Sequence, residues 1–223
     1  MSLLPETAPA PEQLDVRGRT ISTFVLYAIV ERLAGLREGD GLTVLTDRDE
    51  PLDNDLHAWC SATGTELRDA TSEGGHRRYE LVKGPARQAS GKLAMVVSDP
   101  GLEQLLSPLA FALAAALEGI DVHVYVQGPA VKALARGFRE KLPGLRRPFS
   151  RFARDGLARA GHVPAQEKLR QLHRLGGHIY VCGPSMRHFR VSKQDLVFDD
   201  LPIVEYATFV QVMNDATIHV FLQ

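Results

Sequence analysis

The chain has 223 residues, of which 44% are hydrophobic and 24% are charged, and its formal net charge is −1. This composition is ordinary for a globular protein and provides no overall charge that would favour nucleic acid or a membrane. The stretch PLAFALAAAL is too short to span a bilayer, and the first residues, MSLLPETAPAPEQ, do not resemble a signal peptide. Two cysteines form no secretory disulfide framework and have no spacing typical of zinc, so we expect a cytoplasmic protein without metal or cofactor.

The first half of the chain is predicted to be a small α+β domain. Residues 1–11 are rich in Pro, Ala and Glu and are expected to be a disordered tail. Over 12–84, strand signals and helical spacings alternate and end in a hairpin, which predicts a β-α-β-α-β-β two-layer sandwich. Ser22 or Thr23 is the expected N-cap of its first helix. Residues 85–91 have the composition of a linker.

The second half, residues 92–223, is predicted to be a separate α/β domain. Its first strand, LAMVVSD, is a continuous apolar run, as expected for a parallel sheet that is covered on both faces. Helical segments alternate with these strands, which predicts a doubly wound fold with a mainly parallel sheet. Residues 203–216, IVEYATFVQVMNDA, are expected to form one helix. The main predicted strands cover residues 93–99, 121–127, 178–182 and 217–223.

Cys182 ends a predicted strand and is the main candidate for a reactive residue. Ligands of open parallel sheets bind beyond the carboxyl ends of the strands. If a helix begins at Gly183-Pro184, its amides and dipole would favour the reactive thiolate, and Ser185 could donate a hydrogen bond. The alternative is that Cys182 is a small, buried hydrophobic residue with no chemical role.

The charge distribution favours a role for this edge of the sheet. Between Lys132 and Arg190 lie 14 of the 26 basic residues and three acids, so the segment is near +11 and the rest of the chain near −12. The Arg-rich loop 136–159 could share a positive rim with Cys182, which would lower the thiol pKa and attract an anion or an acidic protein. The alternative is a solvated, mobile basic surface. No aromatic-interleaved motif supports nucleic-acid binding.

The residues around the cysteine are the other candidates. Gln127 follows a neighbouring predicted strand and is expected at the same carboxyl edge, and Asp99 is expected to cap a turn or helix there. His188 is too far along a helix to be assumed a base and is expected at the surface. The predicted substrate- or anion-binding residues are Gly183, Ser185, Met186, Arg187 and Gln127.

The second half resembles the DsrE/DsrF-like family of sulfur-relay proteins. The matching segments are the strand LAMVVSD, the helix and strand ALEGIDVHVYVQG, and above all LGGHIYVCGPSMRHFRVSKQDL. The resemblance implies a parallel sheet flanked by helices, homo-oligomers, and a cysteine at the place of Cys182 that carries sulfur as a persulfide.

The first half resembles the TusA family of small sulfur carriers in LDVRGRTISTFVLYAIVERLAGLREGDGLTVLTD and DLHAWCSATGTEL. That family opens its first helix with Cys-Pro-x-Pro. Here the cysteine position is Ile21, and Ser22 and Phe24 replace the prolines. Isoleucine can neither attack nor hold a persulfide, so this module would lack carrier chemistry. Cys60 matches a position in the second helix and is expected to be structural.

Three functional hypotheses remain open from the sequence. In the first, the protein is a sulfurtransferase or sulfur-binding protein that receives sulfur on Cys182 from a persulfide donor protein and passes it to an acceptor. In the second, it is a non-catalytic binding or scaffold module. In the third, Cys182 is a thiol peroxidase site with Arg187 and Arg190 nearby.

Overall fold

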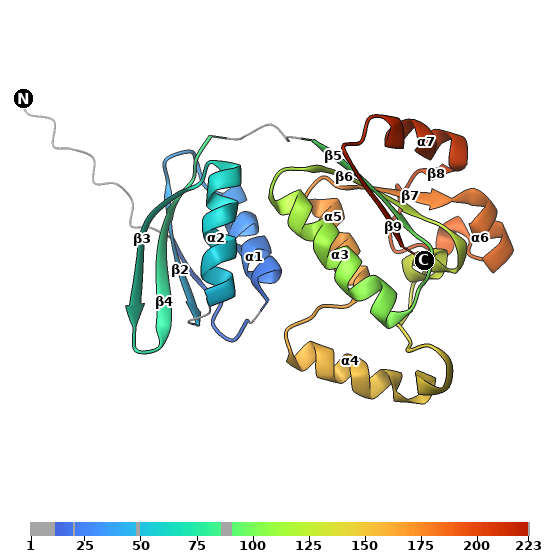
Figure 1. Cartoon of the computed structure of the whole chain (residues 1–223), viewed down its shortest axis with the longest axis horizontal. Coiled ribbons are helices and arrows are strands. Elements are labelled where there is room, and N and C mark those ends of the chain that lie inside the picture. The colour runs from blue at the N-terminus through green and yellow to red at the C-terminus, as the bar shows by residue number, and fades with distance from the viewer. Residues whose placement is uncertain (1–11, 20, 48–49, 86–90, 223) are drawn as a thin grey trace, which may run out of the picture. The chain divides into compact units, whose positions relative to one another are not determined.

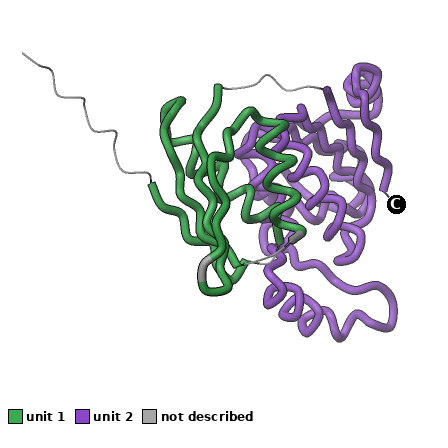
Figure 2. The backbone as a smooth tube through the Cα atoms, turned by 60° about the vertical axis from the view of Figure 1, so that its left-hand side comes forward, with its two compact units in different colours: residues 1–87 green, residues 88–223 purple. Residues whose placement is uncertain are grey.

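The structure is a computed structural model, and it describes the chain over residues 12–19, 21–47, 50–85 and 91–222. The tail predicted over 1–11 lies outside the described residues, as does all but the two ends of the predicted linker. The chain divides into two compact units, residues 1–87 and residues 88–223 (Figure 2). Each unit contains a sheet of its own and is described separately.

The first unit is a four-stranded mixed sheet with both of its helices on one side (Figure 1). The strand order is β1-β2-β4-β3, in which β1 and β2 are parallel and the other neighbours are antiparallel. This confirms the predicted β-α-β-α-β-β two-layer sandwich. Its elements are β1 (Glu12–Asp15), α1 (Ser22–Ala34), β2 (Gly41–Asp47), α2 (Glu50–Thr63), β3 (Glu66–Glu73) and β4 (His76–Val82).

Helix α1 forms because its apolar residues recur on one face, but its N-terminus differs from the prediction. The N-cap is Ile21, with extended backbone and no side-chain cap, and not Ser22 or Thr23. The Ser22 hydroxyl instead donates to the Asp55 carboxylate of α2, so this side chain joins the two helices. The buried face comprises Phe24, Val25, Leu26, Tyr27, Ile29 and Leu33.

The second unit is built on a five-stranded sheet in which all neighbouring strands are parallel. The strand order is β8-β7-β6-β5-β9. The last strand, β9, therefore pairs with β5 on the side of β5 that faces away from β6. This confirms the predicted doubly wound α/β fold. The strands are β5 (Lys92–Val97), β6 (Asp121–Val126), β7 (His178–Cys182), β8 (Ile203–Val204) and β9 (Ile218–Leu222).

Helices flank this sheet, and none of the helices in the described part of the chain is long and apolar enough to cross a membrane.

The expected helix over 203–216 is partly wrong, because Ile203 and Val204 pair with β7 as a short strand before the helix begins at Tyr206. Both residues are β-branched, which favours the strand. The α-helices are α3 (Leu102–Leu117), α4 (Ser150–Arg159), α5 (Ala165–Arg174), α6 (Gly183–Phe189) and α7 (Tyr206–Asn214).

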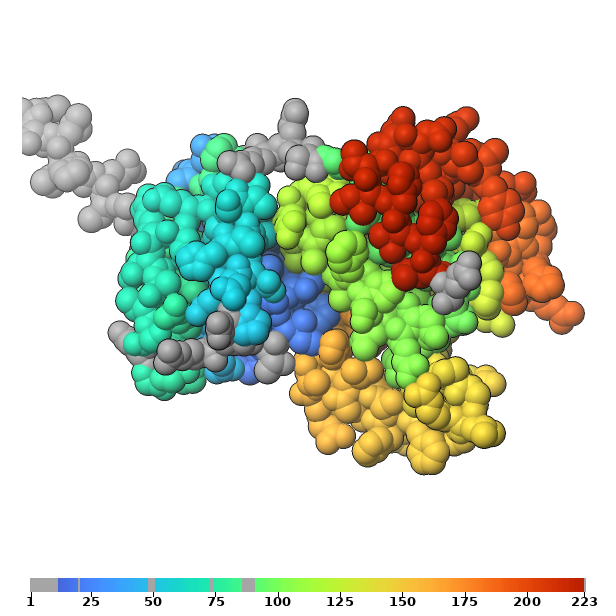
Figure 3. Space-filling view, viewed as in Figure 1, coloured from blue at the N-terminus to red at the C-terminus, as the bar shows by residue number. Residues whose placement is uncertain are grey.

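The Arg-rich segment 136–159 is more ordered than the loop expected from the sequence. It contains a 3-10 helix, η2 (Gly144–Phe149), followed directly by α4. Figure 3 shows α4, coloured yellow to orange, in a lobe that projects from the rest of the second unit. Two further 3-10 helices, η1 (Gly128–Leu134) and η3 (Lys193–Asp195), lie on either side of this segment in the chain.

The second unit buries a lysine beside α3. Lys168 of α5 is 1% exposed, and its Nζ donates to the Leu106 carbonyl at 2.5 Å. Burial disfavours the charged form and lowers the pKa of Lys168 to about 8, although the neighbouring Glu140 carboxylate acts in the opposite direction. Glu140 is itself buried and accepts a hydrogen bond from the Ala165 amide.

We expect this lysine to impose a pH dependence on stability. Between about pH 8 and 10.5 the unfolded chain binds the Lys168 proton more tightly than the folded chain, so the free energy of unfolding rises with pH. Below pH 8 the cost of the buried charge is fully present, and Lys168→Met should remove the rise of stability between pH 8 and 10.5. Denaturant unfolding across this range measures both effects. The exposed Lys193→Met is the control, and an unchanged slope in Lys168→Met would contradict the assignment.

Candidate functional site

Cys182 lies at the carboxyl end of β7, the edge of the sheet at which the sequence places it. It is the last residue of the strand and the N-cap of α6, with Pro184 in the first turn of that helix. The Cys182 side chain is fully buried, with an exposed fraction of 0%. The chain therefore combines an edge position that suits chemistry with a sulfur atom that solvent does not reach.

A directed hydrogen bond reaches the sulfur from Ser185. The Ser185 hydroxyl donates to Cys182 Sγ at 3.0 Å, one turn into α6. The Ser185 oxygen in turn accepts a hydrogen bond from the Gly128 amide at 2.8 Å. Because the backbone amide occupies a lone pair of that oxygen, the hydroxyl proton is directed to the sulfur, where it stabilises a thiolate.

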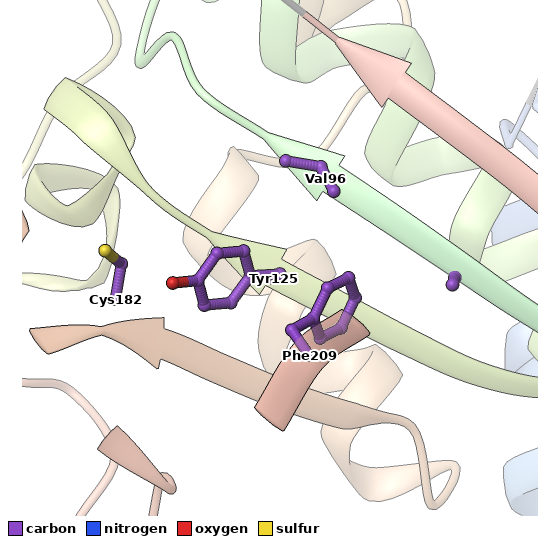
Figure 4. Packing of buried hydrophobic residues seen from close by; sticks show 5 residues of the cluster. Val96, Tyr125, Cys182 and Phe209 are labelled. Carbon is purple, nitrogen blue, oxygen red and sulfur yellow. The ribbon is translucent and has the colours of Figure 1, made fainter. Parts of the chain in front are cut away.

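Two tyrosines complete the surroundings of the sulfur. Tyr125 of β6 is 2% exposed, and Figure 4 shows its hydroxyl directed toward Cys182. In the part of the chain that the structure describes, this buried hydroxyl makes no hydrogen bond of ordinary geometry. Tyr206, the first residue of α7, lies edge-on to Tyr125 with 6.2 Å between ring centroids and is 57% exposed.

These contacts shift the acidity of the thiol. Burial by itself raises the pKa of Cys182, but hydroxyl contacts from Ser185, Tyr125 and Tyr206 and the Ser185 amide oppose burial and together exceed it. The pKa of Cys182 therefore lies below its ordinary value. The opposite holds for Cys60 in the first unit, where burial raises the thiol pKa to about 11. Of the two cysteines, Cys182 is the one whose thiol pKa is lowered.

Access to the sulfur is closed on the side of α7. Cys182 packs in one apolar cluster with Ala94, Val96, Tyr125 and Phe209, the last from α7 (Figure 4). The Tyr206 hydroxyl is among the groups that lower the pKa of Cys182, and Tyr206 is itself more than half exposed, so this residue extends from the surroundings of the sulfur to the surface.

The other predicted site residues are distributed along the same edge of the sheet. Met186 is buried, and the Gly183 backbone is covered by Ile203. Arg187 is exposed and forms an ion pair with Glu205 at 3.5 Å, immediately before Tyr206. The Gln127 amide donates to the Ser98 hydroxyl at 3.0 Å, so it is engaged away from the sulfur.

The remaining sequence candidates have local roles. The Asp99 carboxylate accepts a hydrogen bond from the Gly101 amide at 2.6 Å, which confirms the expected capping role before α3. His188 is exposed on α6 and lies edge-on to the Phe189 ring, as expected for a surface histidine. Cys60 is buried, as expected for a structural residue.

The basic segment forms a hollow of its own at this edge. A concavity of about 720 Å³ is bordered by residues that follow β5 and β6, including Asp99, and by four cations, Lys132, Arg139, Lys141 and Arg147. Neither Cys182 nor Arg187 is among its lining residues. The Arg-rich segment therefore borders a separate hollow and not the cysteine, and the groups that lower the pKa of Cys182 are hydroxyls and an amide, not the predicted positive rim.

Sequence reasoning missed Tyr125 and Tyr206. Tyr125 is two residues before Gln127 in an apolar strand, and the alternation of the strand puts its side chain on the face opposite Val124 and Val126. That alternation was a usable signal for Tyr125. No comparable signal existed for Tyr206, because the sequence predicted it inside a helix and not at its beginning.

Comparison with known proteins identifies the second unit. The model of the DsrE/DsrF-like family matches residues 91–221, which is more than half of the chain. The chain belongs to the DsrE/DsrF-like family. Proteins of the DsrE/DsrF-like family generally act in sulfur relay.

Two further comparisons place limits on that assignment. No curated protein matches the chain. The crystal structure of the ychN protein from E. coli is similar at 18% sequence identity and a TM-score of 0.45, covering 59% of this chain and 99% of that one. The DsrE/DsrF-like assignment therefore rests on the family match and covers the second unit.

Proposed function

We propose that this DsrE/DsrF-like protein binds and transfers sulfane sulfur as a persulfide on Cys182. The observation that carries the proposal is the Ser185 hydroxyl, which donates to Cys182 Sγ at 3.0 Å while its oxygen is held by the Gly128 amide. Such a donor stabilises the thiolate, which is both the attacking and the leaving group of persulfide exchange. The lowered pKa of Cys182 supports the same role.

The proposed reaction is a reversible exchange at one sulfur atom. The Cys182 thiolate attacks the outer sulfur of a donor persulfide, R–S–SH, and the S–S bond of the donor breaks. The donor leaves as the thiolate R–S⁻, and Cys182 holds the persulfide Cys–S–SH. An acceptor thiolate then attacks that outer sulfur and Cys182 leaves as a thiolate. Both steps balance in electrons and protons and require no external oxidant.

The test is mass spectrometry of the intact protein after incubation with a small-molecule persulfide donor. We expect one adduct of about 32 Da, the mass of one sulfur atom, which a reducing thiol removes. Cys182→Ser should lose the adduct completely, and Cys60→Ser should keep it. An adduct of equal size on Cys182→Ser, or one located on Cys60, would overturn the proposal.

We further propose that the first unit is a TusA-like module that serves in docking or assembly. The support is its β-α-β-α-β-β fold together with Ile21, the N-cap of α1, at the position where the resembled carriers have their cysteine. A hydrocarbon side chain holds no sulfur, so Cys182 is the sulfur site of the whole chain.

The partners we propose are persulfide donor and acceptor proteins and a second copy of this chain. The four cations around the 720 Å³ hollow would attract an acidic protein surface. Three apolar side chains on α7 and β9, Tyr206, Val210 and Phe221, are each more than half exposed and would gain stability from burial in an oligomer. A reducing cytoplasm would keep Cys182 available as a thiol.

The second candidate function is a non-catalytic scaffold, and the complete burial of Cys182 favours it. Titration with a thiol reagent separates the two functions. A carrier requires Cys182 to react in the native protein at a measurable rate, whereas a scaffold labels at Cys182 only as fast as the whole unit unfolds.

A further inference from the structure

Three metal-binding side chains meet at the other end of the same strands. Asp121 is the first residue of β6, His123 lies two residues further on, and His178 is the first residue of β7. The parallel register places His123 directly beside His178. Because side chains of a strand alternate between faces, Asp121, His123 and His178 all lie on one face of the sheet.

The separations between their polar atoms fit a single ion. Asp121 Oδ2 lies 2.9 Å from His123 Nε2, and Asp121 Oδ1 lies 3.5 Å from His178 Nε2. One atom from each of the three residues can be chosen so that all lie within 4.8 Å of one another. Tetrahedral zinc with bonds of about 2.0–2.2 Å places its ligand atoms roughly 3.3–3.6 Å apart. The two imidazoles are stacked with 4.5 Å between ring centroids, so binding requires the half-exposed His178 ring to turn toward the ion.

A hydrogen bond behind the cluster orients its central histidine. His123 Nδ1 lies 3.0 Å from the hydroxyl of Tyr180, which shares this face of β7 with His178. With Nδ1 engaged, His123 presents Nε2 to Asp121. Metal-binding histidines characteristically have such a partner on the second ring nitrogen.

The exposure of the three residues is that of an open site. The His123 side chain is 8% exposed, whereas the side chains of Asp121 and His178 are 37% and 54% exposed. An ion here would be bound by the buried His123 on the side of the sheet and would keep one coordination position open to water. The cluster is separate from the sulfur site, because His178 and Cys182 are at opposite ends of β7, about 13 Å apart along the strand.

We propose that Asp121, His123 and His178 form a binding site for a divalent transition metal ion, with Zn²⁺ as the best match and water as the fourth ligand. Two imidazoles and one carboxylate suit zinc better than the hard cations Mg²⁺ and Ca²⁺. Lys92 of β5 is the register partner of Asp121 and opposes a cation there. Its replacement by methionine should therefore strengthen binding.

The test is a titration of the full chain with Zn²⁺, followed by calorimetry, and with Co²⁺, followed by visible absorption. Cys182→Ser is the background, so that the thiol does not compete, and the protein carries no polyhistidine tag. We expect one ion per chain and a Co²⁺ spectrum of low coordination number. Affinity should fall at least about tenfold in Asp121→Asn and in His178→Ala.

Three variants complete the design. His188→Ala removes an exposed histidine of α6 and should bind like the background, and Lys92→Met should bind more tightly. His123→Ala tests the buried ligand, and the half-exposed His178 provides the same test if His123→Ala does not fold. Unchanged affinity in both Asp121→Asn and His178→Ala, or no binding at micromolar metal, would overturn the proposal and leave the cluster as an Asp–His ion-pair network.

Discussion

Replacing Tyr206 by alanine is expected to expose Cys182 and to raise its labelling rate by a thiol reagent about tenfold. The Tyr206 hydroxyl helps to lower the pKa of the buried thiol, and Tyr206, the first residue of α7, is 57% exposed. Loss of side-chain contacts worth about 1.4 kcal/mol shifts a local opening equilibrium by a factor of roughly ten. The rate is measured at a pH where the thiol is fully ionised, so that it reports access alone.

The variant Tyr206→Phe separates the effect of Tyr206 on reagent access to Cys182 from its effect on the pKa of the thiol. This variant keeps the ring but removes the hydroxyl that helps to lower the pKa of Cys182, so the pH profile of labelling should move to higher pH. Val210→Ala, an exposed residue of the same helix, is the matched control, and Cys60 is an internal one. If Tyr206→Ala labels no faster than Val210→Ala, Tyr206 does not control access.

Gly84→Ala is expected to destabilise the first unit by about 3 kcal/mol. A Cβ atom at Gly84 would lie 1.9 Å from the carbonyl oxygen of Gly64 and 2.7 Å from its carbonyl carbon. Both are backbone atoms just after α2. Unlike the end of a flexible side chain, they cannot rotate away from the added Cβ atom. The backbone after β4 must therefore move or the unit must loosen.

The fluorescence of Trp59 measures this effect. Trp59 is the single tryptophan of the chain and is 2% exposed in the first unit, so its emission reports the unfolding of that unit. Gly35→Ala is the control, because a Cβ there would meet only the Arg32 carbonyl, at 3.6 Å. Equal denaturation midpoints for the two variants would show that the close approach of Gly84 and Gly64 is not a constraint.

The order and type of most elements were predictable from the sequence. Strand β5 is a continuous apolar run after Lys92, and such a run marks a strand buried on both faces of a parallel sheet. The hairpin between β3 and β4 was signalled by Gly74 and Gly75, which have φ values of 58° and 86° that other residues adopt with difficulty. These signals are local, so no knowledge of neighbouring strands was needed.

Features that depend on pairing between distant segments were not predictable. Ile203 and Val204 form β8 only because the end of β7 offers them hydrogen-bonding partners. The helix α4 was concealed by a composition that suggested a solvated loop. The Asp121, His123 and His178 cluster has no sequence signature, because two strands from separate parts of the chain contribute it.

The sequence by itself determined that Cys182 ends a strand and that Ser185 follows one helical turn later. Only the tertiary structure decided that the sulfur is fully buried, that Tyr125 and Tyr206 approach it, and that the Arg-rich segment surrounds a hollow of its own. The reason is physical. Position along a strand or helix follows from local residue pattern, whereas burial and acidity follow from side chains that other strands and helices bring to the same place.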